Sequence, residues 1–255
     1  MNAPFRRSLP LASRLQPEPS LDDATLEDGL DLGFPGFDPA RPSLDALSFD
    51  SSGSVSAVSG ADPVGNRFAE AYRAVQVVRA WSFTRRPKVA VIHFDQPSTG
   101  DTTVLPLNRA GSLFAVRAAL AIPASAIGSS NLGPALAKAE QLAERYADHD
   151  VRLTIFSDFE LFDDDLDDIF NRLKGFPGQV HAVVLSAEPP PDLRGENISI
   201  TRISHDDPLG AVAAAVHRSL TATRRGRRLS PLHELRTQPS IPPLSPENSS
   251  KKADL

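Results

Sequence analysis

The sequence predicts an α/β fold, in which a doubly wound, mostly parallel sheet has one antiparallel edge strand and helices on both faces. Short apolar runs alternate with amphipathic helical patterns along the middle of the chain, an order typical of parallel sheets with helical crossovers. One run, KVAVIHF at residues 88–94, is almost continuously apolar, which indicates a strand covered on both faces. No G-x-G-x-x-G follows the first strand and no P-loop motif occurs, so we expect neither a dinucleotide site nor a P-loop.

The apolar spacing places each element in turn. A period of two or a continuous apolar run marks a strand, and a stripe at three- and four-residue spacing marks a helix. The strand at 102–107 follows its predecessor after too few residues for a parallel crossover, so we expect it to run antiparallel. The expected strands are 44–49, 88–94, 102–107, 151–156, 179–185 and 197–203, and the expected helices are 63–81, 112–120, 132–146, 163–173 and 208–221.

Local signals also predict how three helices begin. Ser130 or Asn131 can cap the helix at 132–146, because both side chains accept hydrogen bonds from free amides of a first turn. The acidic run 163–165 falls in the predicted first turn of its helix, where the helix dipole favours negative charge. Asp207 and Pro208 would supply the N-cap and the first-turn proline of the last helix.

The composition divides the chain into three parts. Residues 1–42 contain seven prolines and no sustained periodicity, so we expect a disordered or loosely docked acidic segment. Within it, residues 21–32 mix acids with spaced leucines, a pattern that fits either a short docking motif or a soluble linker. Residues 43–223 form the predicted domain. Residues 224–255 are rich in Arg, Pro and Ser and are expected to be a disordered tail, with the basic cluster at 224–228 in solvent.

Charge and cysteine content exclude several classes of function. The net charge is −5, and the ends carry −3 (residues 1–42) and +4 (residues 224–255), so the middle of the chain carries −6. An acidic middle argues against nucleic acid as the main partner. The absence of cysteine excludes disulfides, thiolate zinc sites and a cysteine nucleophile. No apolar run reaches the length of a signal peptide or a membrane span, so we expect a cytoplasmic protein with no membrane partner.

Oxygen-bearing side chains follow two of the predicted strands. Asp50, Ser52 and Ser54 come directly after the first strand, and Asp158 ends the strand at 151–156. Ser130 lies in the turn Gly128-Ser129-Ser130-Asn131-Leu132, before a helix. These loops share the carboxyl edge of a doubly wound sheet, where their side chains can meet. Hydroxyl and carboxylate oxygens suit Mg²⁺ or Mn²⁺, although a polar turn with internal hydrogen bonds is the alternative for the first loop.

The three motifs together resemble the von Willebrand factor type A (vWA) domain and its metal-ion-dependent adhesion site. The family pattern is D-x-S-x-S, then a G-G-T-[DN]-L-like turn, then a T-D-G-like strand end, and the likeness covers about residues 43–223. It implies that Ser52 and Ser54 bind the metal directly, while Asp50 and Asp158 act through waters or hydrogen bonds. Ser130 takes the place of the family's threonine.

The resemblance also carries expectations about the ligand. Phe159 stands where the family has glycine, so its side chain is expected to crowd the ligand face. The open metal position in this family takes a carboxylate from the partner, which implies a protein partner offering Asp or Glu. Bacterial cytoplasmic members often act as adaptors, including beside AAA-type ATPases. The expected function is therefore a metal-assisted protein-interaction module rather than an enzyme.

Two other functions stay open from the sequence. A metal-dependent hydrolase or phosphoryl-transfer enzyme could use the same loops, and it would need a general base. His93 lies near the end of a strand and His205 lies just after one, so either could be this base, although a core or loop role fits each. Asp95 follows His93 and could support such a base, although a turn role also fits it. A metal-free vWA scaffold is the other alternative. The acidic residues 22–31 could in addition reach the open metal position from within the same chain.

Overall fold

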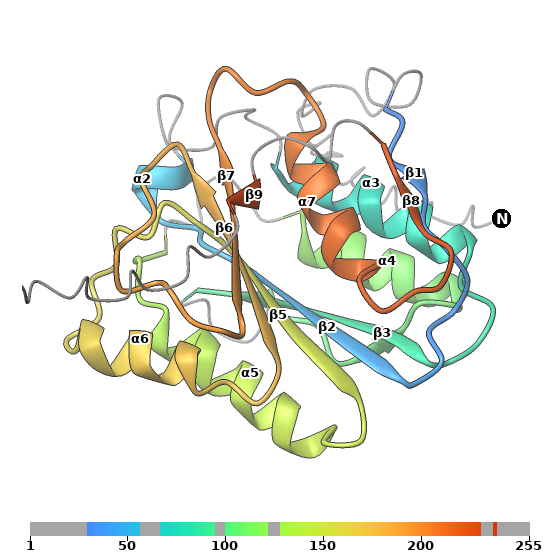
Figure 1. The fold of residues 1–255 in the computed structure, drawn as a ribbon, viewed down its shortest axis with the longest axis horizontal. Helices are drawn as coiled ribbons and strands as arrows, with labels where there is room; N and C mark the ends of the chain where they lie inside the picture. Colours follow the sequence, from blue (N-terminus) through green and yellow to red (C-terminus); the bar gives the residue numbers. More distant parts are fainter. Residues whose placement is uncertain (1–29, 57–66, 95–99, 122–127, 231–236, 239–255) are drawn as a thin grey trace, which may run out of the picture.

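The computed structural model describes residues 30–56, 67–94, 100–121, 128–230 and 237–238. They form a sheet of seven strands in the order β4-β3-β2-β5-β6-β7-β9 (Figure 1). The parallel strands are β2 (Ser43–Phe49), β3 (Pro87–His93), β5 (Asp150–Ser157), β6 (Gln179–Leu185) and β7 (Ile198–Ile203). The short strand β4 (Leu105–Pro106) pairs antiparallel with β3, as its short connection predicts.

The fold class predicted from the sequence is thus confirmed, with one addition. Strand β9 (Thr237–Gln238) pairs antiparallel with β7 and gives the sheet a second antiparallel edge. The chain proceeds from β2 to β3 on one side and later from β5 to β6 and β7 on the other. The strand order therefore reverses between β2 and β5, and ligands of open α/β sheets bind at such a switch point.

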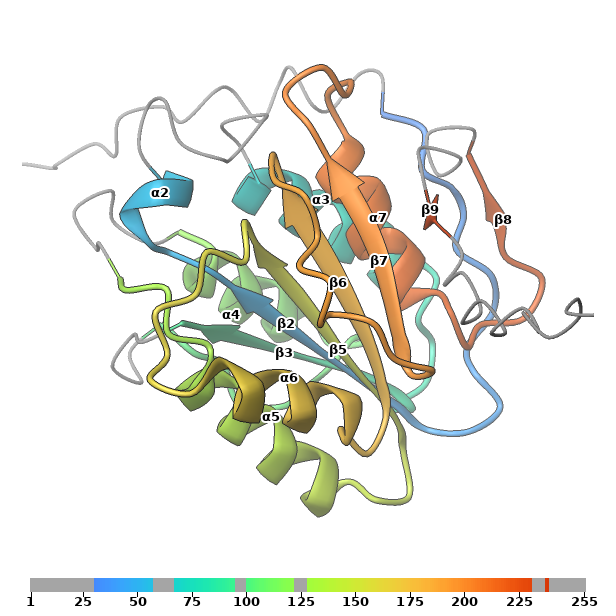
Figure 2. The same cartoon turned by 60° about the vertical axis from the view of Figure 1, so that its left-hand side comes forward.

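Helices cover both faces of the sheet (Figures 1 and 2). On one face lie α3 (Arg67–Ala80), α4 (Ala110–Ala119) and α7 (Ala211–Leu220), and on the other lie α5 (Gly133–Arg145) and α6 (Leu166–Lys174). A single turn, α2 (Gly53–Ser56), follows β2. Among the described residues, no helix combines the length and apolar character needed to cross a membrane.

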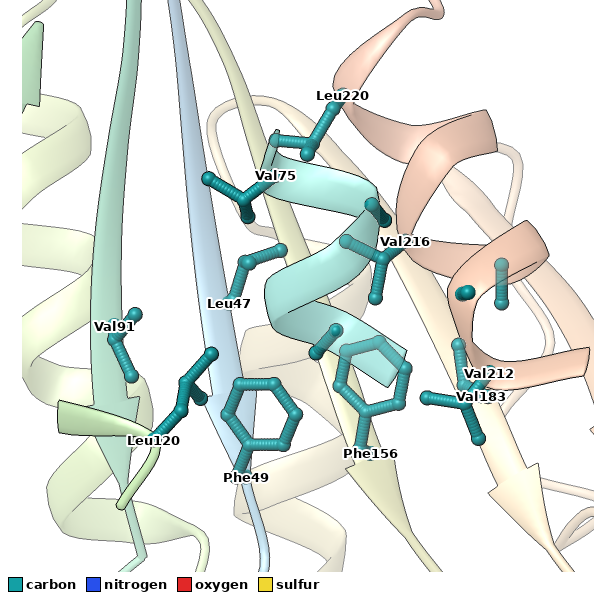
Figure 3. Packing of buried hydrophobic residues seen from close by; sticks show 14 of the residues in the cluster. Leu47, Phe49, Val75, Val91, Leu120, Phe156, Val183, Val212, Val216 and Leu220 are labelled. Atoms are coloured by element: carbon teal, nitrogen blue, oxygen red, sulfur yellow. The ribbon is translucent and has the colours of Figure 1, made fainter. Parts of the chain in front are cut away.

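Two buried clusters hold these layers together. Alternate residues of β2 point to opposite faces, so Leu47 and Phe49 pack beneath α3 and α7 while Leu44 packs beneath α5 and α6. Figure 3 shows the first cluster, in which side chains from α3 and α7 meet the strands. The rings of Phe49 and Phe156 stack with centroids 4.8 Å apart. Phe49 is the last residue of β2 and Phe156 is the last but one of β5, so apolar packing secures the ends of both strands.

Helix α5 is capped from a distant loop. The carboxylate of Asp163 accepts hydrogen bonds from the amides of Leu132 (2.8 Å) and Gly133 (2.7 Å). The prediction that Ser130 or Asn131 caps this helix is therefore wrong. Helix α6 begins at Leu166, because Asp165 is its N-cap and accepts from the Asp168 amide at 2.9 Å. Asp163 thus lies before the first turn of α6, where it was predicted, and caps α5 instead.

Helix α7 is also capped by a residue far away in sequence. Gly210 precedes it with a φ of 98°, a left-handed conformation that glycine adopts without strain. The buried carboxylate of Glu70, on α3, accepts from the amides of Gly210 (2.9 Å) and Ala213 (3.0 Å). Asp207 instead accepts from the Ser204 amide at 2.7 Å, so its prediction as N-cap is wrong.

Two segments outside the predicted domain limits pack on the domain. Leu32 is 2% exposed, and β1 (Gly33–Phe34) pairs antiparallel with β8 (Arg228–Leu229). Arg224 is 5% exposed, and its guanidinium donates to the Gly36 carbonyl (3.3 Å) and to the Ser82 hydroxyl (3.0 Å). The prediction of a solvated basic cluster is therefore wrong for Arg224. The limits of 43 and 223 leave out residues 30–42 and 224–230, which belong to the folded unit.

Candidate metal site

Asp50 is held in one orientation directly after β2. Its amide donates to the Phe156 carbonyl at 2.9 Å, which continues the pairing of β2 with β5. Its carboxylate accepts from the Ser52 amide (2.8 Å) through Oδ1 and from the Ser157 hydroxyl (2.7 Å) through Oδ2. Because each oxygen has a donor, the carboxylate is fixed at the switch point between the two strands.

Burial and a second acid shape the electrostatics of Asp50. Its side chain is fully buried, and the loss of hydration raises the pKa of its carboxyl above the ordinary value. The hydrogen bonds from Ser157 and Ser52 oppose this rise, and the negative charge of Asp158 adds to it. A pair of carboxylates at a buried point favours a cation, which relieves their repulsion.

The two serines of the first loop lie side by side. The hydroxyls of Ser52 and Ser54 are 3.0 Å apart and share a hydrogen bond. Ser52 is buried and Ser54, in the turn α2, is exposed. The guanidinium of Arg67 donates to the carbonyls of Asp50 (2.9 Å) and Val55 (3.5 Å), so it holds both ends of this loop.

The loop that carries Ser130 is tied to the first loop. The Gly128 amide donates to the Ser51 carbonyl at 3.0 Å, in a bridge that pairs Gly128 with Ser52. Ser130 is 1% exposed, and its hydroxyl has no hydrogen-bond partner among the described residues. The hydroxyl of Ser51 is likewise buried without a partner. An unsatisfied buried hydroxyl is costly and calls for an explanation, such as an ion.

Asp158 follows β5 and completes the candidate set. It is 5% exposed, and its Oδ1 accepts from the Glu160 amide at 3.1 Å. The Phe162 amide donates to the Ser130 carbonyl at 3.2 Å, which joins this loop to the one before α5. The structure thus ties together the three loops that carry Asp50, Ser52, Ser54, Ser130 and Asp158.

Phe159 adopts a conformation that suits glycine. Its φ is 60°, in the left-handed region that few non-glycine residues enter. The side chain is 6% exposed and belongs to the buried cluster beneath α5 and α6. The aromatic ring therefore lies in the core, which differs from the expectation that it crowds the ligand face.

The donor set fits a hard divalent cation. It consists of two carboxylates and three hydroxyls, and oxygen ligands of this kind suit Mg²⁺ or Mn²⁺. The described residues contain no group of three or more His, Cys, Asp or Glu side chains able to hold a metal. A site built here would therefore depend on its serine hydroxyls as much as on its acids.

Two residues of this region had no role assigned from the sequence. Ser157 orients Asp50, and its hydroxyl also accepts from the Phe159 amide at 2.9 Å. Its position next to Asp158 in the motif was the available signal. Arg67 supports the first loop from α3, and nothing in its local sequence distinguishes it from a surface arginine.

Comparison with known proteins defines the fold. A scan against protein families finds no match, and a search of curated proteins finds no significant match. Among solved structures, a von Willebrand factor type A protein from Catenulispora acidiphila is 17% identical with a TM-score of 0.51, over 71% of this chain and 42% of that one. The pilus adhesin SpaC from Lactobacillus rhamnosus GG is 11% identical with a TM-score of 0.56, over 74% and 30%.

A third match is a single domain. The VWA domain of SpRpn10 is 14% identical with a TM-score of 0.50, over 72% of this chain and 98% of that domain. The chain spans less than half the length of the first two proteins. At such low identity the likeness shows the fold alone, and this fold is that of von Willebrand factor type A domains.

Proposed function

We propose that this protein is an interaction module that binds Mg²⁺ or Mn²⁺ and, through the ion, a carboxylate of a protein partner. Ser52, Ser54 and Ser130 would bind the ion directly, and Asp50 and Asp158 would hold it through waters or hydrogen bonds. When bound, the ion would supply a positive charge with an open position for an acidic side chain.

One observation carries the proposal. Three loops meet at the switch point between β2 and β5, and there the Ser130 hydroxyl is buried with no hydrogen-bond partner among the described residues. A buried hydroxyl without a partner costs free energy unless an acceptor takes its proton in a hydrogen bond or its oxygen coordinates a cation. The carboxylate of Asp50, on the loop that pairs with Gly128, is buried and oriented, so these joined loops offer both negative charge and hydroxyl oxygens.

The fold supports an interaction role by analogy. One structural neighbour is a pilus adhesin, and an adhesin works by binding a partner. In the family that the chain resembles, such modules act as adaptors, and an AAA-type ATPase is the class of partner that the resemblance implies. The cytoplasmic location expected from the sequence stays a prediction.

Calorimetry with Mg²⁺ and Mn²⁺ tests the site. Asp50→Asn keeps the shape of the side chain and removes its charge, so we expect affinity for the ion to fall about tenfold or more, or about 1.4 kcal/mol. Asp45→Asn is the matched control, because it replaces a buried acid in β2, the strand that leads into Asp50, outside the candidate donor set. Equal ion binding by the wild type and Asp50→Asn would refute the site.

A pull-down tests the partner. The wild-type protein in Mg²⁺ should retain a protein that is lost in EDTA and is not retained by Asp50→Asn. Retention that survives EDTA would refute a metal-mediated contact and support the metal-free scaffold instead.

The surroundings of His93 do not suit the general base that the hydrolase alternative needs. The ring of His93 is buried, and its Nε2 is bound to the Ala119 carbonyl at 3.0 Å. Burial lowers the pKa of His93, while the ring packs near Phe49 and Phe68 in the core. His205 is exposed after β7, and Asp95 lies outside the described residues. A screen against phosphate esters in Mg²⁺ should therefore show no turnover.

A further inference from the structure

A face of exposed aromatic and arginine side chains lies where the flanking segments meet α3. Phe37 is 58% exposed, Trp81 is 40% exposed and Phe83 is 69% exposed, although aromatic rings are usually buried. Exposed arginines of the C-terminal segment lie beside them. We call this surface the aromatic–arginine face, and its members are Phe34, Phe37, Trp81, Phe83, Arg225 and Arg228.

Contacts between the rings join Phe34, Phe37 and Trp81 into one patch. The ring of Phe34 makes edge contacts with the rings of Trp81 and Phe37, and the distances between ring centroids are 4.8 Å and 5.5 Å. The guanidinium of Arg228 lies 5.8 Å from the centre of the Phe34 ring. Residues directly opposite each other in a strand pair project to the same side, so the pairing of Phe34 with Arg228 and of Phe37 with Arg225 places rings and cations together.

The face carries positive charge that the described residues do not neutralise. Neither Arg225 nor Arg228 forms an ion pair with a carboxylate in the part of the chain that the structure describes. Asp38, one residue after Phe37, is already engaged with the guanidinium of Arg224 at 3.5 Å. It also accepts from the Phe83 and Thr84 amides at 3.1 Å and 2.7 Å. The face therefore suits a ligand with both acidic and apolar side chains.

We propose that the aromatic–arginine face binds residues 21–29 of the same chain. This segment, LDDATLEDG, carries Asp22, Asp23, Glu27 and Asp28 together with two leucines. Its carboxylates match the unpaired arginines, and its leucines match the exposed rings. This docking does not depend on the metal site proposed above.

The attachment point of the segment favours binding in cis. Leu30 packs against the core and Leu32 is buried, so the chain is anchored two residues before Phe34, itself part of the face. Nine residues span about 30 Å when extended, enough to cross back over the face. Tethering supplies an effective concentration on the order of 1 mM, so a contact with an affinity of about 0.1 mM would cover the face in roughly nine-tenths of the molecules.

Trp81 is the only tryptophan of the chain, so its fluorescence reports on this face in the full-length protein. The test compares quenching by acrylamide in the wild type and in a variant with Asp22→Asn, Asp23→Asn, Glu27→Gln and Asp28→Asn. The quenching constant should rise roughly twofold in the variant, because the covered fraction falls. Salt at 0.5 M should raise the wild-type constant in the same direction through screening.

A matched control changes the same charge elsewhere. Glu144→Gln, Asp164→Asn, Asp192→Asn and Glu196→Gln neutralise four exposed acids away from the face and should leave quenching unchanged. A synthetic peptide of residues 18–29, added to the neutralised variant, should restore the shielding of Trp81. The same peptide should bind roughly tenfold more weakly after Arg225→Glu and Arg228→Glu.

Three outcomes would overturn the proposal. Equal quenching of the wild type and the neutralised variant at low salt would show that the acids do not cover the face. Shielding of Trp81 that is lost in EDTA would show that coverage of the face requires a metal ion, which contradicts docking that is independent of the metal site. Equal quenching combined with shielding by a single-stranded oligonucleotide would assign the face to nucleic acid, since aromatic and arginine side chains also stack on bases.

Discussion

Replacing Ser130 by alanine should raise the stability of the metal-free protein. The Ser130 hydroxyl is 1% exposed and has no hydrogen-bond partner among the described residues. Burying an unsatisfied hydroxyl costs about 1–3 kcal/mol, and losing the packing of one oxygen atom offsets part of the gain from removing it. We therefore expect Ser130→Ala to be more stable by about 1 kcal/mol in EDTA, or roughly 2–4 °C in Tm.

The same substitution should have the opposite effect when the ion is bound. A ligand at 100 times its Kd stabilises the folded state by about 2.7 kcal/mol. If loss of the Ser130 hydroxyl weakens ion binding about a hundredfold, the variant keeps only about 0.4 kcal/mol of that stabilisation. The order of stabilities therefore reverses, with Ser130→Ala above the wild type in EDTA and below it in saturating Mg²⁺.

Urea unfolding in EDTA and in Mg²⁺ measures both effects. Ser51→Ala is the matched control, because the Ser51 hydroxyl is also buried without a partner but is not among the proposed ligands. It should gain stability in EDTA and respond to Mg²⁺ like the wild type. If Ser130→Ala is less stable than the wild type in EDTA, or gains as much from Mg²⁺, the reasoning fails.

Three further predictions concern buried polar groups. Glu70→Gln should cost about 2–4 kcal/mol in urea unfolding, since a neutral amide cannot accept from both α7 amides; a loss under 1 kcal/mol would contradict the capping role. Arg224→Lys should lower amide protection at Phe37 in hydrogen exchange, because an ammonium cannot reach the Gly36, Ser82 and Trp81 oxygens together; unchanged protection would count against this contact. Burial raises the pKa of Asp45 to about 7, so the stability that Asp45 contributes is full below its ordinary pKa of 3.8 and is lost as pH rises through 7. Burial lowers the pKa of His181 to about 3, so the stability that His181 contributes is full above its ordinary pKa of 6.5 and is lost as pH falls towards 3. Between pH 4 and 6.5 the two contributions oppose each other. Asp45→Asn should therefore lose stability more steeply than the wild type as pH falls, and the stability of His181→Gln should fall as pH rises. Urea unfolding across this pH range measures both, and parallel curves of stability against pH for the three proteins would refute this assignment.

The strand-end loops illustrate how far sequence reasoning reached at the candidate site. Asp50 and Asp158 each follow an apolar run, and the carboxyl ends of parallel strands share one edge, so their common location was predictable. The sequence did not reveal that β2 and β5 are neighbours, because strand order depends on which sides the crossovers take. Nor did it show the hydrogen bond from Ser157 to Asp50, which spans 107 residues.

The sequence by itself determined the α/β class, the antiparallel run of β4 and the position of each major strand and helix within a few residues. These properties follow from apolar periodicity and connection length, which are local. The tertiary structure alone decided the helix caps by Asp163 and Glu70, the docking of Leu32 and Arg224, and the addition of β9 to the sheet. Each of these depends on groups far apart in sequence, and a polar group buried by folding takes whichever partner the packed layers bring within reach.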